Sequence, residues 1–304
     1  MTRSRATAIG FTAVLLWALL ALFTVGSAPV PPLQLNAMCF AVGGTLGLIW
    51  AARTGQLAAL RRIPPAAFLL GTIGLFGYHA LYFAALSNAP PAQAGLIAYL
   101  WPLLIVLFSA CLPSERLHGR HLIGVTLALF GCWLLLGGGN SDFDWNYLPG
   151  YLAALCCALI WALYSLSGRW ISQVPTDTVG AICGLCALLG WGAHLLWEDG
   201  YWPGEIGQWL AVFGLGVGPL GLAFLAWDRG IKQGNLQLLG VLSYGAPLIS
   251  TAVLILFTDI VADETVYLAC TAIVLGALVA ALGSALIPVS LRRSKSMADR
   301  KLLR

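Results

Sequence analysis

Long apolar runs separated by short polar segments make up most of the sequence. A helix needs roughly 20 mainly apolar residues to cross the hydrocarbon core of a bilayer, and these runs are of about that length. They lack the period-two alternation that membrane strands would show. The pattern predicts an all-α membrane protein with ten transmembrane helices, at residues 7–27, 34–52, 66–86, 92–112, 120–137, 150–171, 178–197, 208–228, 236–257 and 265–287.

Composition excludes a soluble protein, because 60% of the residues are hydrophobic and only 9% are charged. Soluble domains carry roughly 25% charged residues. The first apolar run follows Arg3 and Arg5, as in a signal peptide, but it extends to Val25 and is longer than the apolar region of a signal peptide. We therefore expect a retained first helix.

The basic residues orient the chain, because all 16 Lys and Arg residues fall on one side if the connections alternate across a membrane. The other side carries acidic residues, among them Asp142, Glu198 and Glu264. By the positive-inside rule, both termini are expected to be cytoplasmic. The basic positions are Arg3, Arg5, Arg53, Arg61, Arg62, Arg116, Arg120, Arg169, Arg229, Lys232 and those of the tail from Arg292 to Arg304.

Short stretches of similar sequence in the two halves of the chain indicate an internal repeat. Because each half would hold five spans, an odd number, the second half would enter the membrane inverted. The matching stretches are Trp17-Ala-Leu with Trp161-Ala-Leu, Tyr99 to Pro102 with Tyr244 to Pro247, and Gly124 and Gly131 with Gly276 and Gly283. We expect two five-helix repeats around a central cavity.

These repeats set the expected domain boundaries. The first repeat is expected at residues 1–140 and the second, inverted repeat at 150–288. Residues 289–304 form a basic tail, which the charge pattern places in the cytoplasm.

Aromatic residues in the third and fourth spans are the main candidates for a substrate site. Tyr78 and Tyr82 are one helical turn apart and share a face, with His79 beside them. A histidine inside a membrane span tends to face a cavity or a partner. The alternative is a packed neutral imidazole bonded to a backbone carbonyl. Tyr99 and Trp101 complete this candidate site.

Weaker candidates lie in other spans. Trp17 and Trp161 extend the aromatic set, and aromatic faces bind rings, aliphatic chains or cations. Pro102 and Pro247 occupy corresponding places and are expected to kink their helices, since proline removes a backbone hydrogen bond. Neighbouring helices could equally well satisfy the freed backbone, which would leave these kinks purely structural.

Missing motifs narrow the function. The chain has no Gly-x-x-x-x-Gly-Lys loop and no metalloprotease or esterase motif, so we expect neither an enzyme nor a cofactor. Cys183-x-x-Cys186 has the spacing of a zinc or redox pair but has no further ligands nearby, so no metal site is expected. Acidic and basic residues are absent from the middle of the expected spans. His79 is therefore the candidate carrier if protons are coupled to transport.

Several stretches resemble the EamA-type members of the drug/metabolite transporter superfamily. The region from Tyr82-Phe-Ala-Ala-Leu through Pro102 resembles that family's third and fourth spans, and Glu115-Arg-Leu resembles its entry to the fifth. The Tyr-His-x-x-Tyr and Tyr-x-Trp-Pro clusters are most similar to YddG-type aromatic amino acid exporters. The second half departs from the family pattern, since Asp263-Glu-Thr stands where Glu-Arg-Leu would be.

The resemblance implies a multi-pass exporter in a bacterial inner membrane. We expect export of aromatic and other neutral or amphipathic amino acids by alternating access, with broad specificity. The alternative is a multidrug or quaternary-ammonium exporter that uses the same aromatic cavity. The expected partners are the small-molecule substrate and the lipid bilayer, without nucleic acid or an ATPase subunit, and the working expectation for the oligomeric state is a monomer.

Overall fold

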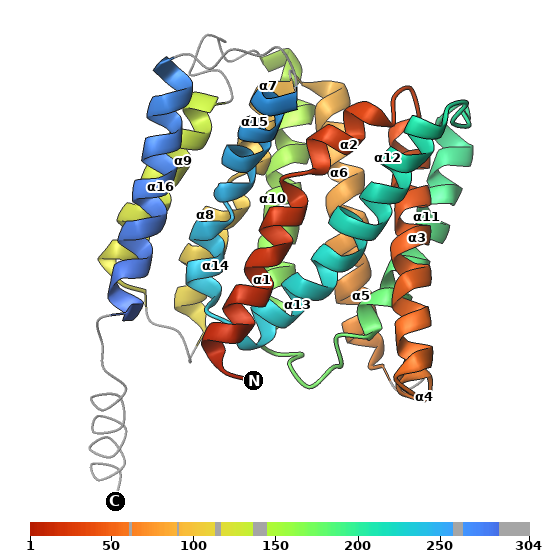
Figure 1. The fold of residues 1–304 in the computed structure, drawn as a ribbon, viewed down its shortest axis with the longest axis horizontal. Coiled ribbons are helices and arrows are strands. Elements are labelled where there is room, and N and C mark those ends of the chain that lie inside the picture. The colour runs from red at the N-terminus through yellow and green to blue at the C-terminus, as the bar shows by residue number, and fades with distance from the viewer. Residues whose placement is uncertain (61–62, 90, 113–116, 136–144, 258–263, 286–304) are drawn as a thin grey trace, which may run out of the picture.

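In the computed structural model, helices stand side by side and follow one another through short links (Figure 1). The structure describes residues 1–304 except 61–62, 90, 113–116, 136–144, 258–263 and 286–304. Helices are the regular secondary structure throughout the described residues.

Within the described residues, helices occupy the apolar runs of the sequence, in several cases as two or three consecutive pieces. In chain order they are α1 Arg3–Trp17, α2 Leu20–Gly26, α3 Pro32–Arg53, α4 Leu57–Leu60, α5 Pro65–Thr72, η1 Ile73–Gly77, α6 Tyr78–Asn88, α7 Pro91–Ala98, α8 Trp101–Phe108, η2 Ser109–Cys111, α9 Gly119–Leu135, η3 Trp145–Tyr147, α10 Leu148–Ser167, α11 Thr178–Trp197, α12 Ile206–Val217, η4 Gly218–Leu222, α13 Ala223–Gln233, α14 Leu236–Leu242, α15 Gly245–Phe257 and α16 Glu264–Ala285.

Within the described residues, five helical stretches are long and apolar enough to cross a membrane. They are Arg3–Thr24, Pro32–Arg53, Trp145–Ser167, Thr178–Trp197 and Ile206–Gln233. Other apolar helices are shorter, as in Trp101–Cys111 and Gly119–Leu134. The chain is thus an all-helical protein with several helices suited to a bilayer.

Two of the expected spans are broken at similar places. α7 ends at Ala98 and α8 begins at Trp101, while α14 ends at Leu242 and α15 begins at Gly245. Pro102 and Pro247 lie in the first turns of α8 and α15, where a backbone N–H has no intrahelical acceptor anyway. The breaks precede both prolines.

Two π-helices also lie at similar places. η1 leads directly into α6 at Tyr78, and η4 leads directly into α13 at Ala223. A π-helix widens the turn by one residue and is frequent at functional sites. Each one here precedes a helix that carries residues of the aromatic cluster described below.

Glycines allow several helices to pack with their backbones close together. A Cβ atom added to Gly47 of α3 would lie 2.5 Å from the Cα of Gly180 in α11, so these two helices are in close backbone contact. In α9, a Cβ atom on Gly124 would lie 2.6 Å from the carbonyl oxygen of Gly276 in α16. Small residues at such contacts favour helix association in membranes.

Candidate substrate-binding site

Four tryptophans from four helices meet in the interior. The Trp17 ring centroid in α1 lies 6.3 Å from that of Trp101 in α8, 5.5 Å from Trp161 in α10 and 5.2 Å from Trp227 in α13. Trp101 and Trp227 are 5.7 Å apart. Most of these contacts are edge-on or tilted, the geometry that aromatic pairs prefer.

The tryptophan group continues into a second set of rings. Tyr78 lies 5.2 Å from Trp161, and His79 lies 5.2 Å from Tyr78. His79 in turn lies 5.3 Å from Phe40 of α3 and 6.0 Å from Phe224 of α13. We call the whole set the aromatic cluster: Trp17, Phe40, Tyr78, His79, Trp101, Trp161, Phe224 and Trp227.

Hydrogen bonds fix two of the indole rings. The Nε1–H of Trp17 donates to the carbonyl oxygen of Pro219 in η4 at 3.1 Å. The Nε1–H of Trp227 donates to Oγ of Ser165 in α10 at 3.1 Å. These rings are therefore held in position before any ligand binds, which lowers the entropy cost of binding.

His79 is anchored to its own helix. Its Nδ1 lies 2.7 Å from the carbonyl oxygen of Leu75 in η1, four residues earlier. We assign the proton to Nδ1, because a carbonyl can only accept. The neutral ring then carries its acceptor at Nε2, and the side chain is 9% exposed.

The structure brings together five of the seven residues named from the sequence: Trp17, Tyr78, His79, Trp101 and Trp161. Tyr82 stacks on Tyr78 with centroids 6.0 Å apart and lies at the edge of the cluster. Tyr99 packs against the neighbouring buried group that contains Val106 and Tyr244. It also lies close enough to Tyr78 and Tyr82 to interact with them electrostatically. Phe40 and Phe224 could not be selected from the sequence, because each lies in an apolar run where phenylalanine is ordinary.

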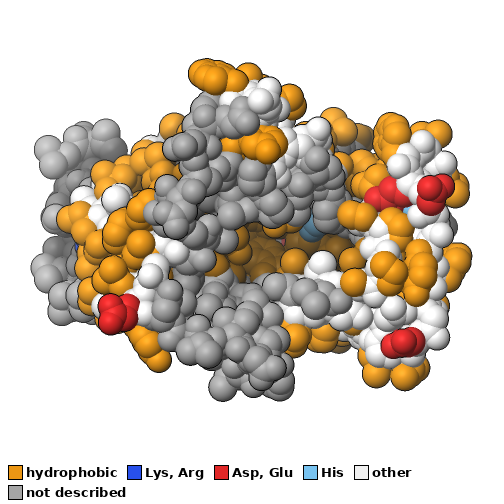
Figure 2. Space-filling model, turned by 90° about the horizontal axis from the view of Figure 1, so that it is seen from above, with side chains coloured by type: hydrophobic (Ala, Val, Ile, Leu, Met, Phe, Trp, Pro, Cys, Tyr) orange, Lys and Arg blue, Asp and Glu red, His pale blue; other side chains and the backbone are white. Residues whose placement is uncertain are grey.

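The molecule is hollowed at one end. Figure 2 shows a central depression with hydrophobic side chains deep inside it and a histidine side chain within it, while the acidic side chains lie toward the periphery of this face. The view looks down on the end at which α3 begins (Figure 1). The depression gives the interior an approach from that end.

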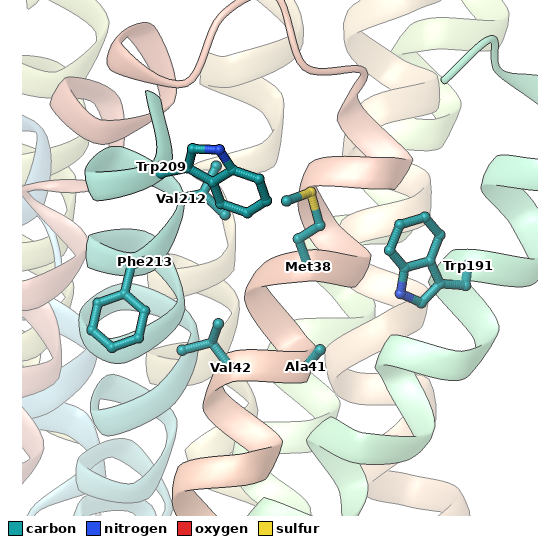
Figure 3. Close-up of a pocket in the computed structure, with 7 residues that line it drawn as sticks. All are labelled: Met38, Ala41, Val42, Trp191, Trp209, Val212 and Phe213. Carbon is teal, nitrogen blue, oxygen red and sulfur yellow. The ribbon is translucent and has the colours of Figure 1, made fainter. Parts of the chain in front are cut away.

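A separate apolar cavity of about 250 Å³ lies between α3, α11 and α12 (Figure 3). Met38 and Ala41 of α3, Trp191 of α11 and Trp209 of α12 are among its lining residues. Its lining offers almost no polar surface, so it cannot satisfy the charges of a zwitterion.

A buried ion pair lies at the opposite end, where α13 runs on to Gln233. The sequence interpretation placed Lys232 in a link between the expected spans, and the structure shows that this side chain is buried. Nζ of Lys232 donates to Oδ2 of Asp228 at 2.8 Å and to the carbonyl oxygen of Val174 at 2.9 Å. The Thr176 hydroxyl donates to the same carboxylate oxygen at 2.7 Å. These bonds tie the α10–α11 link to α13.

Among the described residues, no group of three His, Cys, Asp or Glu side chains could hold a metal ion. Cys183 and Cys186 are free and buried. Burial among apolar neighbours is the usual environment of a structural cysteine.

Comparisons with known proteins agree with this architecture. The model of the EamA-like transporter family matches residues 5–137 and again residues 148–282. The chain belongs to the EamA-like transporter family. It is therefore a transporter of the multi-pass membrane class.

Among its relatives, an aromatic amino acid exporter YddG of Ancylobacter novellus is 48% identical over 93% of this chain and 99% of its own length. The proteins of the same name from Salmonella typhimurium and Escherichia coli are 29% and 28% identical, each over 83% of this chain and 88% of their own lengths. A crystal structure at 48% identity covers 92% of this chain and 99% of its own, with a TM-score of 0.88.

Proposed function

We propose that the chain exports aromatic and other neutral or amphipathic amino acids across a bacterial inner membrane by alternating access. The observation that carries this proposal is the aromatic cluster, found in a chain 48% identical to a named aromatic amino acid exporter. Aromatic faces attract the rings and aliphatic parts of such substrates. They discriminate weakly between side chains, so the specificity is broad.

The proposed transmembrane architecture has ten spans in two inverted halves. The pairing of helices supports it: α3 packs on α11 and α9 on α16, while α1 packs on α13 and α6 on α10. The breaks before α8 and α15 and the π-helices η1 and η4 recur at the same places of each half. Such symmetry would let one central site open to either side in turn.

In the proposed orientation, both termini face the cytoplasm. The link that carries Arg169 and the ion pair of Lys232 lie at the same end as the N-terminus, while Glu198 and Glu205 lie at the other (Figure 1). This is the arrangement that the positive-inside rule favours. The depression of Figure 2 would then open to the periplasm.

A quaternary-ammonium or multidrug exporter is the second candidate, since tryptophan faces also attract cations. Asp228, one residue after Trp227, is the acidic group closest in sequence to the cluster among the described residues. It is already paired with Lys232. This pairing favours neutral zwitterions over cations as substrates.

Purified protein in liposomes tests the proposal. Vesicles are loaded with single labelled compounds, namely phenylalanine, leucine, glutamate and a quaternary ammonium, and efflux is followed with and without a pH gradient. We expect phenylalanine and leucine to leave faster than from protein-free vesicles. Efflux confined to the quaternary ammonium would overturn the proposal in favour of the second candidate.

A further inference from the structure

Asn36 of α3 is a buried amide without a hydrogen-bond partner. It is 2% exposed, and neither its Oδ1 nor its Nδ2 has a partner. A buried polar group left unpaired costs free energy, and native structures contain few of them. An unpaired buried amide such as that of Asn36 therefore needs a functional explanation.

The side chain lies on the inward face of α3. Asn36 and Phe40 are one turn apart and share this face. The Phe40 ring stacks on Phe224 with centroids 5.8 Å apart and meets His79 edge-on. Met38 and Ala41, on the opposite side of α3, line the outer apolar cavity (Figure 3).

The position of Asn36 along the axis of α3 places its amide closer to the start of that helix than the ring of Phe40 is. Four residues of helix rise about 6 Å, so Asn36 lies roughly that far beyond Phe40. It lies toward the end where α3 begins, at which the depression of Figure 2 opens. The amide is thus near the rings on the side from which the interior is approached.

We propose that the Asn36 amide binds the α-ammonium and α-carboxylate groups of the exported amino acid, while the aromatic cluster holds its side chain. An amide offers both an acceptor and two donors, and a zwitterion needs both. The exposed fraction of Asn36 is close to those of Trp161 and Trp101, at 3% and 6%. The amide and these rings are therefore buried to a similar extent in this conformation. This inference rests on the proposed function.

Gln34, two residues earlier, is a structural amide and therefore contrasts with Asn36. Its Oε1 accepts the backbone N–H of Tyr201 at 2.8 Å and so ties α3 to the α11–α12 link. Only its Nε2 lacks a partner. Gln34 therefore serves as the matched control for Asn36.

The test compares Asn36→Leu with Gln34→Leu in the same liposomes and by thermal unfolding in detergent. Asn36→Leu should weaken competition by unlabelled phenylalanine for phenylalanine efflux by about ten-fold or more, because the head group loses its partner. Competition by phenethylamine and 3-phenylpropionate, which each lack one charged group, should change less. Asn36→Leu should also raise the unfolding temperature, whereas Gln34→Leu should lower it.

The outcomes separate the two proposals. If wild-type protein moves no amino acid, both the proposed function and this inference fail. If wild-type protein moves phenylalanine and Asn36→Leu does so with unchanged competition, only the inference fails. A fall in the unfolding temperature of Asn36→Leu as large as that of Gln34→Leu would also overturn it, because the amide would then be structural.

Discussion

Trp17 and Trp161 meet edge to face, with ring centroids 5.5 Å apart and ring planes at 74°. Each is followed by Ala-Leu, and each lies in a different one of the two stretches that match the family model. The cluster is therefore built jointly by both halves of the chain. A movement of one half against the other would change the site itself.

Breaking the buried ion pair should strongly destabilise the protein. Lys232→Met leaves the Asp228 carboxylate buried without its counter-charge, and such losses cost about 3–5 kcal/mol. Thermal unfolding in detergent should show a lower midpoint. The double variant Asp228→Asn/Lys232→Met removes both charges and should regain most of the loss; a double variant as unstable as the single one would contradict this account.

The close contact between α9 and α16 should not tolerate a methyl group. Gly124→Ala places its Cβ 2.6 Å from the carbonyl oxygen of Gly276, and overpacking of this kind costs about 1–3 kcal/mol. The measurement is again the unfolding midpoint. Gly207→Ala in α12 is the control, because a Cβ atom there meets no atom within 4 Å. Equal midpoints for the two variants would show that the helices can separate freely.

Glu198 should stabilise the start of α3. Its carboxylate accepts the backbone N–H groups of Leu33 and Gln34 at 2.8 and 3.0 Å and lies 3.0 Å from Nδ1 of His194. Glu198→Ala should cost about 0.5–2 kcal/mol, as the loss of a helix cap does. The neighbouring Asp199 is exposed, so Asp199→Ala should leave the midpoint unchanged. A similar effect of both variants would argue against a cap.

Cysteine labelling tests the proposed orientation. Trp202 in the α11–α12 link and Trp170 in the α10–α11 link are 62% and 73% exposed at opposite ends of the molecule (Figure 1). In a background without the native cysteines, a maleimide that cannot cross the inner membrane should label Trp202→Cys in intact cells. Trp170→Cys should react only after the cells are opened. The reverse pattern would place the termini in the periplasm.

Apolar runs in the sequence predicted where helices form, but not where they break. The step from α7 to α8 falls at Tyr99 and Leu100, inside a run whose composition does not change. The burial of Lys232 was also not predicted, because the residues that complete its ion pair come from a link far away in the sequence: Val174 accepts from Lys232, and Thr176 donates to its counter-ion Asp228. Such contacts depend on tertiary packing.

Part of the site was visible in the sequence because histidine and clustered tyrosines stand out in a membrane span. Phe40 and Phe224 did not stand out, since phenylalanine is ordinary in apolar runs. Asn36 carried a usable signal, as a polar residue inside an apolar run. Without the fold, however, a structural amide such as Gln34 cannot be distinguished from an unpaired one.

The measurement that tests the central claim most directly is efflux of labelled phenylalanine from liposomes that contain either wild-type protein or the double variant Tyr82→Ala/Trp101→Ala. Trp170→Ala, which alters an exposed ring in the α10–α11 link, serves as the control. We predict rapid efflux with wild-type protein and Trp170→Ala, and a loss of about ten-fold or more with the folded double variant, because two aromatic walls are removed. Unchanged efflux with the double variant would contradict the assignment of the aromatic cluster as the substrate site.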